Sequence, residues 1–184
     1  MRVPPVPGVT PVALGAPERT AAELVDVLRR IKGVHDPGLE VSAVQAADLA
    51  HRHGAALLAV VEHPRADPAL LVAAVVPGEQ VPDDRVGLGL DGAAVRDVTE
   101  GVTATGYPVV IIERATAVGA QLQVVVRAGR TAVVFTLHST TGRGWWDVSE
   151  VAGRFVSGIE FSGTGSASAS RPRPGGTSAR SGRR

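Results

Sequence analysis

The segment 107–139 limits the possible folds most, because it holds three apolar runs that very short connections separate. The runs are YPVVIIERA, AQLQVVVRA and TAVVFTLHS, and the connections are TAVG and AGR. In the middle run apolar residues alternate with polar ones, namely Leu122, Val124 and Val126 with Gln121, Gln123 and Arg127. Alternation of this kind is typical of a strand with one face on a core, and short connections join antiparallel neighbours only. The segment therefore predicts a three-stranded antiparallel meander.

The preceding part of the chain predicts further strands less uniformly. The runs AALLAVVEH and ALLVAAVV lie on either side of PRADP and predict a hairpin, although their alanine content leaves a helix possible. Residues 39–45, LEVSAVQ, alternate and indicate a strand, whereas AADLAHRHG after them is ambiguous. Residues 77–92 are typical of a loop, and AAVRDVTE at 93–100 indicates a short helix.

A helix is predicted over residues 20–32. Thr20 and Glu23 have the spacing of a capping box, and Gly33 can end the helix in a left-handed turn. The apolar residues recur at helical spacing along one face: Leu24, Val27, Leu28 and Ile31. We therefore expect an amphipathic helix that packs on a sheet.

A second helix is predicted over 147–157, directly after a tryptophan pair. Its apolar stripe consists of Val148, Val151, Ala152 and Phe155. With Asp147 as the cap, Trp146 and Val151 have the spacing of a hydrophobic staple, which would fix the entry of the chain into the helix. Trp145 would instead join the apolar face if the helix began earlier. The pair Trp145 and Trp146 is therefore either part of the core or a partner-binding surface, and both interpretations stay open.

Composition excludes several classes of protein. The chain contains no cysteine, which rules out disulfides, thiol nucleophiles and a lipid-attachment cysteine. The first residues, MRVPPVPGVTPVALGAPER, are broken by prolines and lack the apolar core of a signal peptide. No run approaches the roughly 20 apolar residues that span a bilayer. We therefore expect a cytoplasmic protein without a membrane span.

The last residues, 162–184, differ from the rest of the chain. They contain five arginines, no acidic residue and no large apolar side chain. Such a segment cannot bury enough apolar surface to offset its ordering entropy, so we expect a disordered basic tail. It also lacks the aromatic residues that stack on bases, so specific nucleic-acid binding is not expected.

The order EGVTATGYPVVIIERA, GAQLQVVVRAGRTAVVFTLHST and WWDVSEVAGRFVSGIEF resembles the PsbP-like α/β/α sandwich family, whose bacterial members include actinobacterial lipoproteins of the LpqN type. The resemblance covers mainly residues 99–161. It implies a domain that binds or scaffolds partners rather than one that shares a common reaction. Known members bind partners as different as photosystem subunits and a nuclear-transport GTPase, so it does not identify the partner. The chain departs from the lipoprotein members because it has neither a signal nor a lipobox cysteine.

Two motifs suggest other functions. GLGLDG at 87–92 matches the glycine pattern of dinucleotide-binding loops, but VPDDRV before it is not a buried strand, so a loop is the better interpretation. His51 and His53, with Glu62 or His63 across a hairpin, could supply nitrogen and oxygen ligands to a metal. A small metal- or histidine-dependent enzyme that uses the His51/His53 region is therefore the alternative function.

Two further sets of side chains could suggest catalysis. Ser139, Thr140 and Thr141 lie near His138, but adjacency in sequence does not make a nucleophile and base. Asp83 and Asp84 are interpreted as loop residues. No catalytic residue, cofactor or metal is predicted.

Together these features predict an α+β fold, a mainly antiparallel sheet with helices packed on it. The predicted organisation is an irregular proline-rich segment at 1–17, one domain at 18–161 and the tail. The expected function is non-catalytic binding or scaffolding of an unknown protein partner in a bacterium, with Trp145 and Trp146 as the candidate contact surface.

Overall fold

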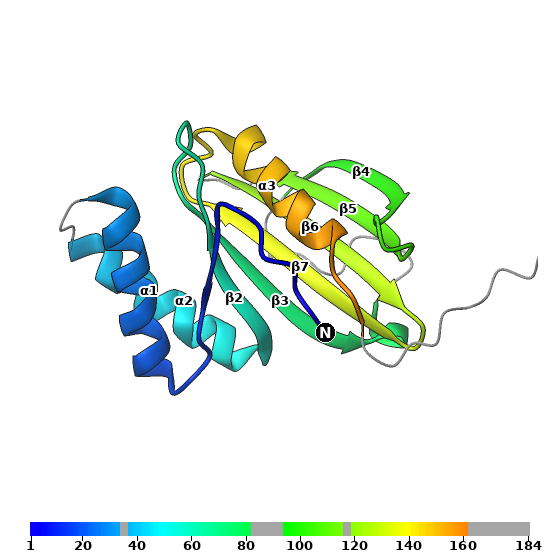
Figure 1. Ribbon diagram of the computed structural model, residues 1–184, viewed down its shortest axis with the longest axis horizontal. Helices are drawn as coiled ribbons and strands as arrows, with labels where there is room; N and C mark the ends of the chain where they lie inside the picture. Colours follow the sequence, from blue (N-terminus) through cyan, green and yellow to red (C-terminus); the bar gives the residue numbers. More distant parts are fainter. Residues whose placement is uncertain (34–36, 82–93, 116–118, 162–184) are drawn as a thin grey trace, which may run out of the picture.

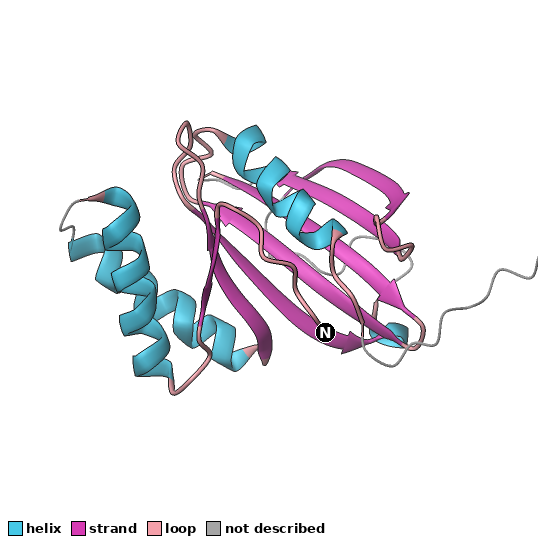
Figure 2. Ribbon diagram, viewed as in Figure 1, coloured by secondary structure: helices cyan, strands magenta, loops and turns pink. Residues whose placement is uncertain are grey.

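The computed structural model shows an α+β protein built on one seven-stranded antiparallel sheet (Figures 1 and 2). It describes residues 1–33, 37–81, 94–115 and 119–161. The strands follow the order β1-β2-β3-β7-β6-β5-β4 across the sheet, and every pair of neighbours is antiparallel. The elements are β1 Val9–Val12, α1 Pro17–Lys32, α2 Pro37–Arg52, β2 Ala55–Val61, β3 Ala69–Pro77, the short 3₁₀ helix Gly78–Gln80, β4 Ala94–Val102, β5 Pro108–Ala115, β6 Ala120–Ala128, β7 Thr131–Ser139 and α3 Trp145–Ser157. The predicted α+β class, the β2–β3 hairpin and the β5–β6–β7 meander are therefore confirmed.

Helices cover the two faces of the sheet. In Figure 1, α1 and α2 lie together beside β2, and α3 crosses the sheet over the later strands. Residues of β2 explain this arrangement, because successive side chains point to opposite faces. Leu58 and Val60 pack with α1 and α2, whereas Ala59 and Val61 belong to the larger core under α3. Both faces of β2 are buried, which accounts for its uninterrupted apolar sequence.

The core under α3 is the larger of the two layers. The helix contributes its apolar stripe, and the meander contributes residues that alternate along β6 and β7: Val124, Val126, Val133, Phe135 and Leu137. Phe135 and Phe155 are among the largest fully buried side chains. Burial of such side chains contributes about 1.5–3 kcal/mol each, so this layer fixes the position of α3 on the sheet.

The N-terminal segment is more ordered than predicted. Residues 1–17 were expected to be irregular, but Val9–Val12 forms the edge strand β1 beside β2. Pro11 lies in this strand, which is possible because a proline is tolerated on an edge strand. Arg2 also pairs with Glu160 in an isolated antiparallel bridge. The sheet therefore holds this segment despite its prolines.

Two predicted elements are wrong. Residues 39–45 were expected to form a strand, but they lie in α2, where Leu39, Ala43 and Ala47 are buried at helical spacing. Small alanines let α2 approach α1 closely, and the alternation of LEVSAVQ does not reflect two faces of a strand. Residues 93–100 were expected to form a helix, but β4 begins at Ala94 and pairs with β5. Pairing with a neighbouring strand overrides a weak helix pattern.

The predicted capping box at Thr20 and Glu23 is also wrong. The helix α1 begins at Pro17, and a proline suits the first position because its missing N–H has no partner there. Thr20 is fully buried and donates its hydroxyl to the carbonyl of Ala13, while Glu23 accepts from the Ala13 N–H. Both side chains therefore hold the loop before α1 instead of capping its first turn. The predicted end at Gly33, with a φ of 66°, is confirmed.

Candidate functional site

The helix α3 begins at Trp145, and this start separates the two tryptophans. Trp145 is 8% exposed and packs in the core under α3, and its indole Nε1 donates to Glu113 Oε1 at 3.1 Å. Trp146 is 78% exposed. The two neighbours on a helix point about 100° apart, so only one of them can face the sheet. The structure thus assigns Trp145 to the core and leaves Trp146 at the surface.

The predicted staple of Trp146 on Val151 is therefore wrong, and the alternative with an earlier helix start is correct. Trp145 joins the stripe three residues before Val148. Gly144, with a φ of 68°, is the residue before the helix, and no side chain caps it. Asp147 lies in the first turn, where its charge favours the helix N-terminus, but it is not the cap.

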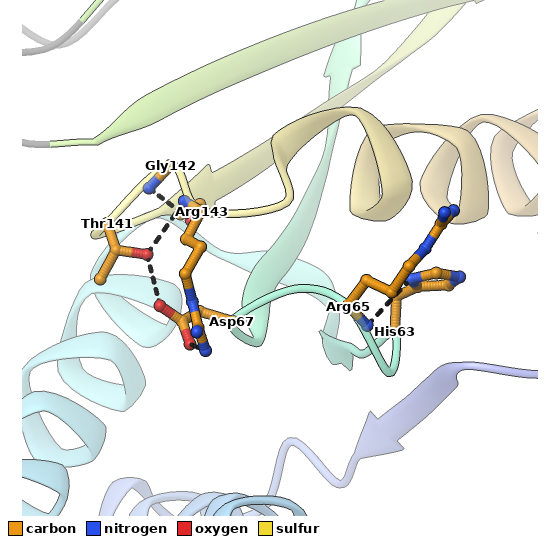
Figure 3. Close-up of polar contacts among 7 residues, drawn as sticks. His63, Arg65, Asp67, Thr141, Gly142 and Arg143 are labelled. Atoms are coloured by element: carbon orange, nitrogen blue, oxygen red, sulfur yellow. Dashed lines mark hydrogen bonds and ion pairs between the residues drawn. The ribbon is translucent and has the colours of Figure 1, made fainter.

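Two loops meet beside Trp146. The first loop is residues 62–68, between β2 and β3, and the second is residues 140–144, between β7 and α3. We call these two loops, together with Trp146 and Asp147, the Trp146 corner. Asp67 accepts from the Arg143 guanidinium at 2.6 Å and from the Thr141 hydroxyl at 2.8 Å (Figure 3). The Asp67 N–H also donates to the Arg143 carbonyl at 3.2 Å. Side-chain and backbone bonds therefore tie the loops together.

A second ion pair joins the first loop to the start of α3. Arg65 lies 2.5 Å from Asp147 Oδ1, and His63 Nδ1 lies 3.7 Å from the same oxygen. The His63 ring also accepts from the Arg65 N–H at 3.3 Å, and Figure 3 shows the Arg65 side chain extending toward α3. Trp146 directly precedes Asp147, so the exposed indole rises from a fixed part of the surface.

The charges of the corner are arranged with the carboxylates inside and the guanidinium groups outside. The side chains of Asp67 and Asp147 are 24% and 22% exposed, whereas those of Arg143 and Arg65 are 74% and 76% exposed. Hydrogen bonds from Arg143 and then from Thr141 lower the pKa of Asp67 below its ordinary value. The corner consequently presents hydrogen-bond donors to solvent.

Gly144 allows the two loops to approach. A Cβ at this position would lie 2.4 Å from the Cβ of Ala66, and its positive φ disfavours other residues as well. The glycines of GRG before the tryptophans thus indicate a close approach of the backbone, but the sequence does not identify Ala66 as its partner. Arg65, Asp67 and Arg143 were not predicted as site residues, because their partners are distant in sequence.

The histidines of the alternative function are not brought together. His51 lies at the end of α2, where its Nε2 is 3.2 Å from the Thr20 hydroxyl, and His53 follows the helix on the surface. Glu62 and His63 follow the other end of β2, about 20 Å away for a strand of this length. Among the residues that the structure describes, no group of three His, Cys, Asp or Glu side chains could hold a metal.

The other predicted candidates have structural roles or lie outside the described ranges. Ser139 is buried and accepts from the Gly142 N–H at 3.1 Å, and Thr141 binds Asp67, so both hydroxyls serve the turn after β7. Thr140 is exposed beside them. Asp83, Asp84, GLGLDG and the tail lie outside the described residues.

The fold and the corner define a class of protein: a mainly antiparallel α+β domain with an ordered surface that carries two arginines beside an exposed tryptophan. In the described part of the chain, no helix has both the length and the apolar character needed to cross a bilayer. Comparison with protein-family models, with curated proteins and with solved structures finds no match for this chain.

Proposed function

We propose that this protein is a non-catalytic binding domain that docks a partner protein through the Trp146 corner. The exposure of Trp146, at 78%, is the observation that carries the proposal. A large indole in water forgoes the hydrophobic stabilisation that Trp145 gains one residue earlier. Contact with a partner would recover that stabilisation.

The composition of the corner supports the same conclusion. Tryptophan and arginine are the residues that most often dominate the energy of protein–protein interfaces, and here Arg65 and Arg143 accompany Trp146. The ion pairs with Asp67 and Asp147 hold both arginines before a partner arrives. Binding to a preorganised surface costs less conformational entropy.

The chemistry of the corner indicates an acidic partner surface. Its guanidinium groups face outward and can donate further hydrogen bonds, while its carboxylates are covered. The resemblance to the PsbP-like family, whose members bind and scaffold partners, supports a binding role. The absence of cysteine is consistent with the cytoplasm as the compartment we propose.

Affinity capture from extracts of the source bacterium tests the proposal, with tagged wild-type protein compared with Trp146→Ala. We expect a captured protein that is lost with Trp146→Ala and with Arg65→Ala, and whose binding shifts the fluorescence of Trp146 to shorter wavelength. Val102→Ala is the matched control, because Val102 is 68% exposed on β4, away from the corner.

The proposal is wrong if every captured protein is retained by Trp146→Ala, or is lost equally with the Val102→Ala control. Thermal melting of each variant must first show an unchanged fold, which we expect because none of the three side chains is buried.

A further inference from the structure

Polar side chains form two rows across the other face of the sheet, away from α3. The strand register places Arg114 of β5 opposite Gln121 of β6, and Gln121 opposite His138 of β7. The row continues to Leu70 of β3, which pairs with His138 and packs against the α1–α2 layer. The row therefore lies on the face of the sheet that α1 and α2 cover, opposite α3. The adjacent row contains Gln123. Polar side chains therefore gather where an antiparallel sheet of this kind usually carries apolar ones.

Three of these side chains are buried, and His138 is partly buried. Arg114, Gln121 and Gln123 are 3%, 1% and 4% exposed. Arg114 Nε donates a hydrogen bond to Gln123 Oε1 at 3.3 Å. Within the described part of the chain, Arg114 Nη2, both polar atoms of the Gln121 amide and His138 Nδ1 have no hydrogen-bond partner.

Burying these unpaired polar atoms destabilises the fold unless another group forms hydrogen bonds with them. A buried polar atom without a partner costs the free energy of its lost hydration, and a buried charge without a counter-ion costs more. No ion pair to Arg114 is found among the described residues. Most buried polar groups in folded proteins are paired, so several unpaired atoms in neighbouring side chains indicate a shared missing partner.

We propose that Arg114, Gln121 and His138 form a binding site for a small organic carboxylate that carries a hydroxyl on the carbon next to the carboxyl group. The carboxylate accepts from Arg114 Nη2 and from the Gln121 amide nitrogen. The ligand hydroxyl donates to the Gln121 amide oxygen. His138 faces the same row, and a neutral imidazole there can take part in one further hydrogen bond.

The donor set explains this choice of ligand. Arginine excludes a metal cation, and its planar guanidinium matches a carboxylate. The single guanidinium of Arg114 balances the one negative charge of a carboxylate but leaves a phosphate dianion with an uncompensated buried charge. The ligand hydroxyl satisfies the amide oxygen of Gln121. Burial lowers the pKa of His138, which keeps its ring neutral at neutral pH. The polar atoms are closed off from solvent, so the ligand must be small.

This site is independent of the proposed partner surface. Trp145 and the rest of α3 lie on one face of the sheet, and the polar rows lie on the other. Loss of partner capture with Trp146→Ala would therefore say nothing about carboxylate binding, and each proposal can fail alone.

Isothermal titration calorimetry with glycolate tests the site, with acetate, phosphate and chloride at equal ionic strength as the comparison. We expect saturable binding of glycolate that is stronger than that of acetate, and no binding of phosphate or chloride. Arg114→Met should weaken glycolate binding by about tenfold to a hundredfold, the usual worth of a charge-assisted hydrogen bond. Arg154→Met, an exposed change on α3, should leave it unchanged.

The melting temperature of the unliganded variant shows whether Arg114 binds a ligand or has a purely structural role. Because the variant removes an uncompensated buried charge, unliganded Arg114→Met should melt no lower than the wild type. If it fails to fold, Arg114 is structural and the proposal is wrong. In the wild type, glycolate should shift the NMR signal of the Gln121 side-chain amide, and Gln121→Leu should weaken binding. No saturable binding of either carboxylate, or equal binding of phosphate, would overturn the assignment.

Discussion

Replacing each tryptophan by alanine should affect stability very differently. Trp145 is 8% exposed, so Trp145→Ala removes nearly a whole indole from the core. An aromatic side chain buries about 150–250 Å², which at about 25 cal/mol per Å² corresponds to roughly 4–6 kcal/mol. Alanine retains part of this area and the unfolded chain buries some as well, so we expect a loss of about 3–5 kcal/mol. Trp146→Ala should change stability by less than about 0.5 kcal/mol.

Urea unfolding followed by circular dichroism measures both changes, provided that the slope against urea stays constant. Trp145→Phe is the control that keeps an aromatic ring but removes the hydrogen bond to Glu113, and it should cost less than Trp145→Ala. If Trp146→Ala proved as damaging as Trp145→Ala, the helix start at Trp145 and the exposure of Trp146 would both be refuted.

Three further changes have defined outcomes. Arg143 lowers the pKa of Asp67 below 3.8, so the carboxylate stabilises the fold above that pH and the benefit is lost as the pH falls through the lowered pKa. At pH 7 the free energy of unfolding of Asp67→Asn should therefore be about 1 kcal/mol lower than that of the wild type. The difference should vanish at a pH below the lowered pKa of Asp67, and thermal melting as a function of pH measures it. Gly144→Ala forces a Cβ against Ala66 at a positive φ and should cost at least about 2 kcal/mol in urea unfolding. Thr20→Val leaves buried backbone partners unpaired and should cost about 1–3 kcal/mol, whereas Thr20→Ser should recover most of this loss.

The elements that sequence alone predicted are those that local rules determine. The meander and the β2–β3 hairpin combine apolar strands with short turns, and such turns allow only antiparallel neighbours. The end of α1 at Gly33 follows from the freedom of glycine at positive φ. The missed elements depend on distant contacts. The strand β4 exists because β5 offers an edge, and α2 is helical because its alanines face α1 and β2.

The candidate site was predictable only in part. The tryptophan pair stood out in the sequence, but which ring is buried depends on Gly144 meeting Ala66, a contact between loops that are far apart along the chain. The pairing of Asp67 with Arg143 has the same origin. The alternation correctly placed Gln121 and Leu122 on opposite faces of the strand. It suggested, however, that the face with Gln121 is exposed. Burial of that face is a property of the tertiary structure.

The pairing of β3 with β7 has a consequence for the order of folding. Every other contact between neighbouring strands in the sheet joins segments closer together in the chain, whereas this one brings Pro77 beside Thr131. Closing such a long loop carries an entropic cost before its contacts form, so the β2–β3 hairpin and the later meander should each gain structure first. Pulse-labelling of amide hydrogens during refolding should then show protection within both halves before it appears along this central seam. The seam would mark the rate-limiting step at which two half-formed sheets become one.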